Sequence, residues 1–124
     1  MHSDVEVTDV EGEHRPSVSQ AFCSALPVAY TRVQSFHWEA FASLVLQAAY
    51  EATILAAMLN AKRGASNVVL LTQLGGGAYG NHDDWINAAM QRALKIASGF
   101  ALDVRLVSFG TPSRAILQMA EEFG

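Results

Sequence analysis

The sequence predicts an α/β fold: a three-layer, mostly parallel sheet with helices on both faces. Three observations support this prediction. Strand-like apolar segments alternate with segments of helical periodicity along the chain. Residues 68–71 form an unbroken Val and Leu run, which is typical of a parallel strand covered on both faces. The stretches between successive strands are long enough for right-handed helical crossovers.

Length and composition indicate one folded domain. The chain has 124 residues, 51% hydrophobic and 16% charged, which suits a single core rather than a disordered chain. We expect a polar arm or edge strand over residues 1–16 and one domain over residues 17–124. The formal net charge of -4 comes without a basic run, so we expect no nucleic acid partner.

We expect a cytoplasmic protein. Cys23 is the only cysteine, and the first thirty residues lack the basic and apolar segments of a secretory signal. The apolar stretch over residues 38–59 contains Glu39 and Glu51 and has no cationic flank before it. We therefore interpret it as a core helix and expect no membrane partner. Cys23 itself is expected in the core.

The first half of the chain predicts two strands and a long helix. Alternation of Val5, Val7 and Val10 with polar residues suggests a short edge strand. Residues 18–26 are rich in β-formers and run into Pro27, which predicts the first core strand.

The long helix is expected over residues 36–62, where an apolar stripe recurs at helical spacing and Gly64 suits the C-terminal stop. The other side of this helix is apolar too, so we expect burial on two sides or a contact with a second copy of the chain. A homo-oligomer is the expected assembly.

In the second half of the chain we expect two further strands that alternate with two helices. Residues 67–74 form an apolar strand that we expect in the centre of the sheet, and residues 82–98 form a helix for which Asn81 is a suitable N-cap. A third strand over residues 103–109 and a terminal helix opened by Pro112 complete the pattern.

A glycine-rich turn joins the apolar strand to the following helix, and we predict that it binds a ligand. Backbone N–H groups without obstructing side chains can approach a phosphate there, next to the positive end of the helix dipole. Four glycines in six residues exceed what a tight turn needs, although Asp83 and Asp84 in the first helical turn repel an anion. The predicted ligand-binding residues are Gly75, Gly76, Gly77, Ala78, Tyr79, Gly80 and Asn81.

The same turn also fits the spacing Gly75-x-Gly77-x-x-Gly80 of dinucleotide-binding proteins. That interpretation requires an acidic residue at the end of the following strand, where the sequence has Ser108 and Phe109. A Rossmann-like dinucleotide-binding enzyme fragment therefore stays an alternative.

The order of elements and the glycine turn together resemble the macro domain family, from about Val5 to Phe123. In that family a strand ending in proline is followed by a long helix, an apolar strand, a phosphate loop with an aromatic residue, a helix, and a last strand and helix. The resemblance implies that residues 76–80 contact the diphosphate and distal ribose of ADP-ribose. Tyr79 matches the aromatic residue that flanks this ribose.

The resemblance covers only the later, C-terminal half of the family pattern, so the fold is expected to be macro-domain-like and truncated at the N-terminus. The segments that carry an adenine-recognising Asp and a first glycine-rich loop have no counterpart before Val5, and Gly76 replaces the usual Thr. We therefore expect an ADP-ribose or nucleotide-diphosphate binding module rather than an enzyme, with no catalytic residue assigned. His82 is the one histidine worth testing as an acid or base.

The sequence suggests neither a metal site nor a resident cofactor, because its histidines lack ligand spacing with Cys23 or with one another. A further alternative is a degenerate structural module without ligand. In it the glycines only turn the chain, and the helix over residues 36–62 mediates self-association.

Overall fold

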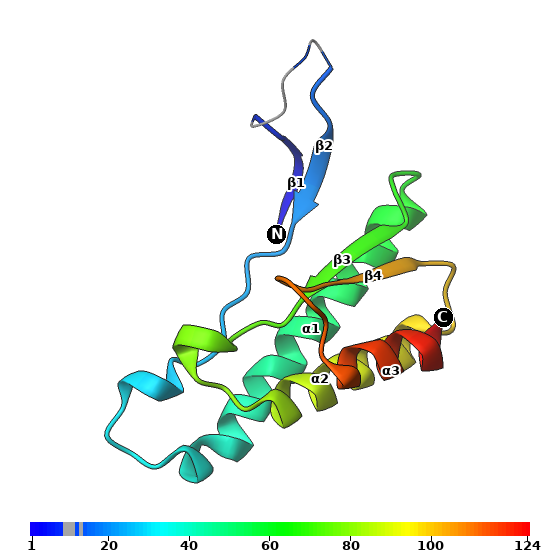
Figure 1. The fold of residues 1–124 in the computed structure, drawn as a ribbon. Coiled ribbons are helices and arrows are strands. Elements are labelled where there is room, and N and C mark those ends of the chain that lie inside the picture. Colours follow the sequence, from blue (N-terminus) through cyan, green and yellow to red (C-terminus); the bar gives the residue numbers. More distant parts are fainter. Residues whose placement is uncertain (9–11, 13) are drawn as a thin grey trace.

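The computed structural model describes residues 1–124 except residues 9–11 and 13 (Figure 1). It is a mixed α/β structure with three α-helices and two small two-stranded sheets. The helices are α1 (Glu39–Lys62), α2 (Asp83–Ala97) and α3 (Arg114–Phe123), and the strands are β1 (His2–Glu6), β2 (Ser17–Gln20), β3 (Val68–Thr72) and β4 (Asp103–Val107). Short 3₁₀ turns occupy Val28–Tyr30 (η1), Ser35–Trp38 (η2) and Gly77–Tyr79 (η3).

The expected parallel pairing is present, but it involves only two strands. β3 and β4 run parallel in continuous register, from Val68 opposite Asp103 to Thr72 opposite Val107. The second sheet, formed by β1 and β2, is antiparallel and separate. Within the described residues the α/β character and the parallel pairing of the sequence prediction are present, and no three-layer sheet is shown.

Helices cover one face of the parallel sheet only. Val69 and Leu71 on β3 are 6% and 3% exposed, whereas Val68 and Leu70 are 40% and 63% exposed. β3 also pairs with β4 alone, so the expected central, doubly covered position of residues 68–71 is not found. The run misled the prediction because Val and Leu occupy the bare face as well as the packed one, and period-2 alternation is then invisible in the sequence.

The core lies between this sheet and the helices. α1 and α2 pack against one another, and α3 packs against α2. The largest fully buried side chains come from all three helices and are Leu46, Ile54, Ile86, Met90 and Met119.

α1 begins and ends close to the expected residues because Glu39 lies in its first turn, Lys62 in its last, and both complement the helix dipole. Its buried face contains Ala42, Leu46, Ala49, Tyr50 and Ile54. By length and composition alone, Ser35–Lys62 could cross a membrane, a property that core helices of soluble proteins share.

The described N-terminal residues form a hairpin. β1 pairs with β2, and Val5 lies opposite Val18. The expected strand over residues 18–26 is therefore reduced to Ser17–Gln20, because beyond Gln20 no neighbouring strand supplies a hydrogen-bonding ladder. Val10, which also supported the edge strand, lies outside the described residues.

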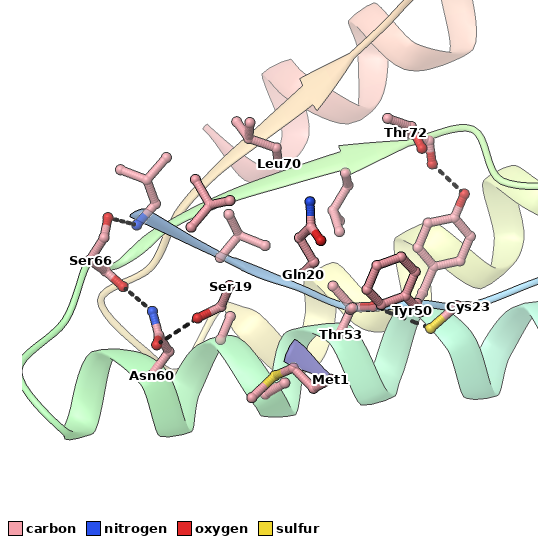
Figure 2. Close-up of a pocket in the computed structure, with 18 of the residues that line it drawn as sticks. Met1, Ser19, Gln20, Cys23, Tyr50, Thr53, Asn60, Ser66, Leu70 and Thr72 are labelled. Carbon is pink, nitrogen blue, oxygen red and sulfur yellow. Dashed lines mark hydrogen bonds between the residues drawn. The ribbon is translucent and has the colours of Figure 1, made fainter. Parts of the chain in front are cut away.

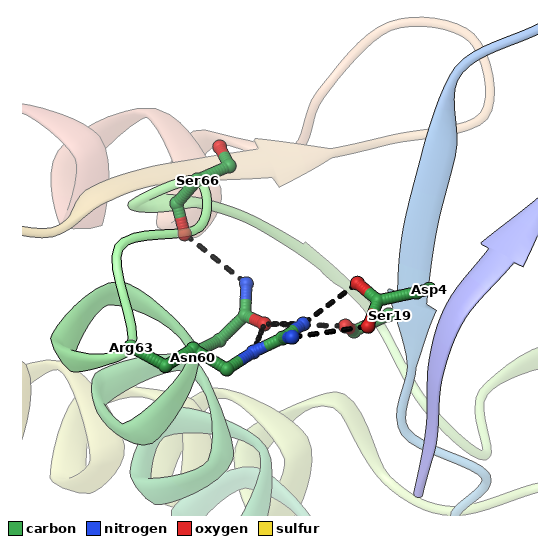
Figure 3. A network of polar contacts seen from close by, with 5 residues as sticks. All are labelled: Asp4, Ser19, Asn60, Arg63 and Ser66. Atoms are coloured by element: carbon green, nitrogen blue, oxygen red, sulfur yellow. Dashed lines mark hydrogen bonds and ion pairs between the residues drawn. The ribbon is translucent and has the colours of Figure 1, made fainter.

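A polar network ties this hairpin to the end of α1 (Figure 3). The Arg63 guanidinium donates to both carboxylate oxygens of Asp4, at 3.0 and 2.7 Å, and also to the side chain of Asn60. Asn60 accepts from Ser19 on β2 and donates to the Ser66 carbonyl oxygen. The hydrogen bond from Arg63 lowers the pKa of the Asp4 carboxyl.

Candidate functional site at the glycine turn

The glycine turn connects β3 to α2 through the short turn η3. Gly75, Gly77 and Gly80 have φ values of 79°, 56° and 69°. This left-handed region disfavours side chains with a Cβ. The backbone therefore requires glycine or a tolerant residue at three positions of the turn.

Two of these glycines also have a packing role. A Cβ on Gly75 would lie 2.2 Å from the Ala25 Cβ, and a Cβ on Gly80 would lie 2.7 Å from the Ala29 Cβ. The segment before η1 thus lies directly against the turn. Close packing accounts for Gly75 and Gly80 without any ligand.

Gly77 differs, because a Cβ there would have no atom within 4 Å. Among the described residues no acceptor is found for the backbone N–H groups of Gly76, Gly77 and Ala78. The turn thus presents three successive donors beside open space, an arrangement that suits an anion.

The buried side chain of Asn81 holds the turn through two hydrogen bonds. It is 5% exposed, and its Nδ2 donates to the carbonyl oxygens of Leu26 at 2.8 Å and Gly75 at 2.9 Å. Its Oδ1 is buried without a partner in the described structure. The expected N-cap role is wrong: His82 is the N-cap of α2, because the Asn81 side chain is engaged by these two carbonyls.

The start of α2 adds further unpaired donors. The described residues supply no side-chain cap to this helix, so the N–H groups of Asp83 and Asp84 stay available to an anion. Asp83 and Asp84 occupy the first turn and are exposed. His82 stacks on Trp85 with ring centroids 4.5 Å apart, and its Nε2 lies 3.1 Å from the Ser35 hydroxyl oxygen.

Tyr79 forms an aromatic corner with Tyr30 of η1. The ring centroids are 6.4 Å apart and the planes are nearly perpendicular, at 88°. Tyr79 is 40% exposed and Tyr30 is 72% exposed. Both rings therefore keep surface for a ligand beside the turn.

Tyr50 of α1 joins the end of β3 to the glycine turn. Its hydroxyl donates to the Thr72 carbonyl oxygen at 2.6 Å and accepts from the Leu74 N–H at 2.8 Å. Burial raises the pKa of the Tyr50 phenol to about 12.

A cavity of about 740 Å³ opens between the hairpin and β3, above α1 (Figure 2). Sequence reasoning missed it, because its walls come from segments far apart in the chain and share no local motif. Cys23 lines this cavity and is exposed rather than in the core as expected, with its Sγ 3.8 Å from the Ala49 carbonyl oxygen. Leu74 and Tyr50 line its end nearest the glycine turn.

In the part of the chain that the structure describes, no three His, Cys, Asp or Glu residues gather as a metal site would require. Comparison of the chain with protein-family models, with curated proteins and with solved structures finds no match.

Proposed function

We propose that this protein is a binding module for ADP-ribose or a related nucleoside diphosphate, held at the glycine turn. The observation that carries the proposal is the row of N–H groups from Gly76 to Ala78, which have no acceptor among the described residues and face open space at Gly77. These donors lie near the start of α2, where no side-chain cap is found among the described residues. Together they form a set of partial positive charges that suits a diphosphate.

The surrounding residues favour a nucleotide over a bare anion. Asp83 and Asp84 weaken the attraction of α2 for free phosphate. A nucleoside diphosphate offsets this repulsion through its ribose, which the corner of Tyr30 and Tyr79 is suited to flank. The resemblance of the turn to the macro domain loop supports the same ligand class. Capture by backbone groups involves no covalent step, so we propose binding without catalysis.

Replacing Gly77 with Val tests the proposal. A Val side chain occupies the open space at Gly77 and strains the left-handed backbone, so we expect binding of ADP-ribose to be lost in isothermal titration calorimetry. Gly64→Val is the matched control: Gly64 also has a positive φ of 86° and open space, but it follows α1, far from the turn. Unchanged binding in a folded Gly77→Val protein would remove the turn from the site.

The choice of ligand is tested by titrating ADP-ribose, NAD, AMP and inorganic phosphate in parallel. We expect ADP-ribose to bind more tightly than phosphate, and Tyr79→Ala to weaken ADP-ribose more than phosphate. Equal losses for both ligands would refute the ribose contact.

A second candidate function is a structural module without ligand. The packing of Gly75 on Ala25 and of Gly80 on Ala29 favours it, because these contacts explain two glycines by chain geometry alone. Failure of all four ligands to bind the folded protein would support this candidate over the first.

A further inference from the structure

The outward face of α1 is apolar from one end of the helix to the other. Within residues 41–61 the exposed positions are Phe41, Leu44, Ala48, Ala52, Leu55 and Leu59. They recur at intervals of three and four and so form a single stripe. The four large side chains are 54%, 60%, 52% and 66% exposed. A contiguous exposed apolar stripe of this kind is typical of an interaction surface.

The order of side chains along the stripe is nearly the same in both directions. Two large residues stand at each end and two alanines stand in the middle. If the helix is reversed about Tyr50, Phe41 falls on Leu59, Ala48 falls on Ala52, and Leu44 falls one residue from Leu55. A two-fold contact between identical helices requires this reciprocity, because residue i meets residue j and j meets i.

We propose that α1 pairs with α1 of a second copy in an antiparallel, two-fold symmetric contact that crosses at Ala48 and Ala52. The small side chains there let the two axes approach to about 8 Å, and the large residues interlock on either side. The contact runs for about 27 Å along each helix. This proposal is independent of the ligand proposed for the glycine turn.

Charge selects the antiparallel direction over the parallel one. Within α1 the charged residues are Glu39 in the first turn, Lys62 in the last turn, and Glu51. Antiparallel pairing brings the Glu39 end of one helix beside the Lys62 end of the other and opposes the two helix dipoles favourably, whereas parallel pairing places like charges together. Glu51, beside the stripe, forms an ion pair with Arg92 of α2 in the same chain.

A second copy fits this surface better than a membrane does. The opposite face of α1 packs on α2 and carries the core residues Leu46 and Ile54, so the helix cannot be surrounded by lipid without loss of that core. The pair of Glu51 and Arg92 would also lie at the middle of such a span.

A charge exchange across the proposed contact tests the geometry. Leu44→Glu places a carboxylate against Leu55 of the second copy, and the change acts twice in a two-fold dimer. We expect dimerisation to weaken by more than about tenfold in sedimentation equilibrium. Adding Leu55→Lys in the same chain creates two opposite-charge pairs, so we expect the Leu44→Glu/Leu55→Lys protein to regain the dimer. In a parallel pair the same double change would put like charges together.

Leu117→Glu on α3 is the matched control, because Leu117 is 50% exposed and lies outside the stripe. We expect this variant to dimerise like the unaltered protein, and circular dichroism melts identify any variant that has failed to fold. Three results would each overturn the proposal. The first is an unaltered protein that stays at the 13.3 kDa of one chain across micromolar concentrations, and the second is a double variant no more dimeric than Leu44→Glu. The third is an unaltered protein that is monomeric in solution but sediments with vesicles of phosphatidylcholine and phosphatidylserine.

Discussion

The Tyr50 hydroxyl on α1 accepts a 2.8 Å hydrogen bond from the Leu74 N–H, at the point where β3 gives way to the glycine turn. The same hydroxyl donates to the Thr72 carbonyl oxygen at 2.6 Å. One side chain therefore holds both sides of the bend that leads into the candidate site.

Tyr50→Phe removes both hydrogen bonds and leaves the Thr72 carbonyl oxygen without this donor. We expect the free energy of unfolding to fall by about 1–3 kcal/mol in urea denaturation. Tyr30→Phe is the control, because Tyr30 is 72% exposed and no hydrogen bond of its hydroxyl is found in the described structure. Equal losses in the two variants would contradict the role assigned to Tyr50.

Alkaline pH should destabilise the protein through the same phenol. Burial raises the pKa of Tyr50 from 10.0 to about 12. Between these values the unfolded chain loses the proton while the folded chain keeps it. Stability is therefore fully present below pH 10 and falls by about 1.4 kcal/mol per pH unit as the pH rises towards the folded pKa. The difference in slope between the unaltered protein and Tyr50→Phe isolates this contribution, and identical slopes would refute it.

The glycines of the turn should differ in their tolerance of alanine. Gly75→Ala and Gly80→Ala bring the new Cβ to 2.2 and 2.7 Å from Ala25 and Ala29, so we expect marked losses of thermal stability. Gly77→Ala meets no atom within 4 Å and carries only the cost of its positive φ, about 1 kcal/mol. Thermal melts in which Gly77→Ala is less stable than Gly75→Ala or Gly80→Ala would contradict the observed packing.

The pair of Asp4 and Arg63 should control how firmly the hairpin stays on α1. Asp4→Asn keeps a residue that tolerates the observed φ of 56° but removes the charge. We expect faster hydrogen exchange in β1 and β2 with little change in the core helices. Asp103→Asn, which breaks the exposed pair with Arg105, should leave hairpin exchange unaltered.

Acid should loosen the hairpin in the same way. Because Arg63 lowers the pKa of Asp4, the contribution of this pair is present above the ordinary value of 3.8 and is lost as the pH falls through the folded pKa. Exchange in β1 should therefore rise at low pH in the unaltered protein, whereas the Asp4→Asn protein should lack this part of the response.

Periodicity was sufficient to predict the helices, and the alternation of strands with helices predicted the parallel pairing of β3 with β4. The Trp85 helix is an example, because Ile86, Ala89, Met90 and Ala93 recur on one face and are all buried. The extent of the sheets was not predictable, because the pairing of Ser17–Gln20 with β1 depends on a partner rather than on local residue types.

At the candidate site, the position of the turn could be predicted from the sequence, but the contacts of each residue in it could not. Gly75, Gly77 and Gly80 are identical in sequence terms, yet only Gly77 faces open space. Asn81 was expected to be a cap because of its position before a helix, but one of its two hydrogen bonds is to Leu26, in a segment far along the chain.

The contacts of the glycine turn with Ala25 and Leu26 also bear on how the protein folds. They connect residues about fifty positions apart, with α1 and β3 between them. Contacts of such high contact order require closure of a long intervening loop before they give any stabilisation, so they form late in folding. The shape of the turn is therefore acquired after α1 and β3 have come together. A fragment that begins at α1 would contain every glycine of the turn and still lack Ala25 and Leu26, against which the turn packs.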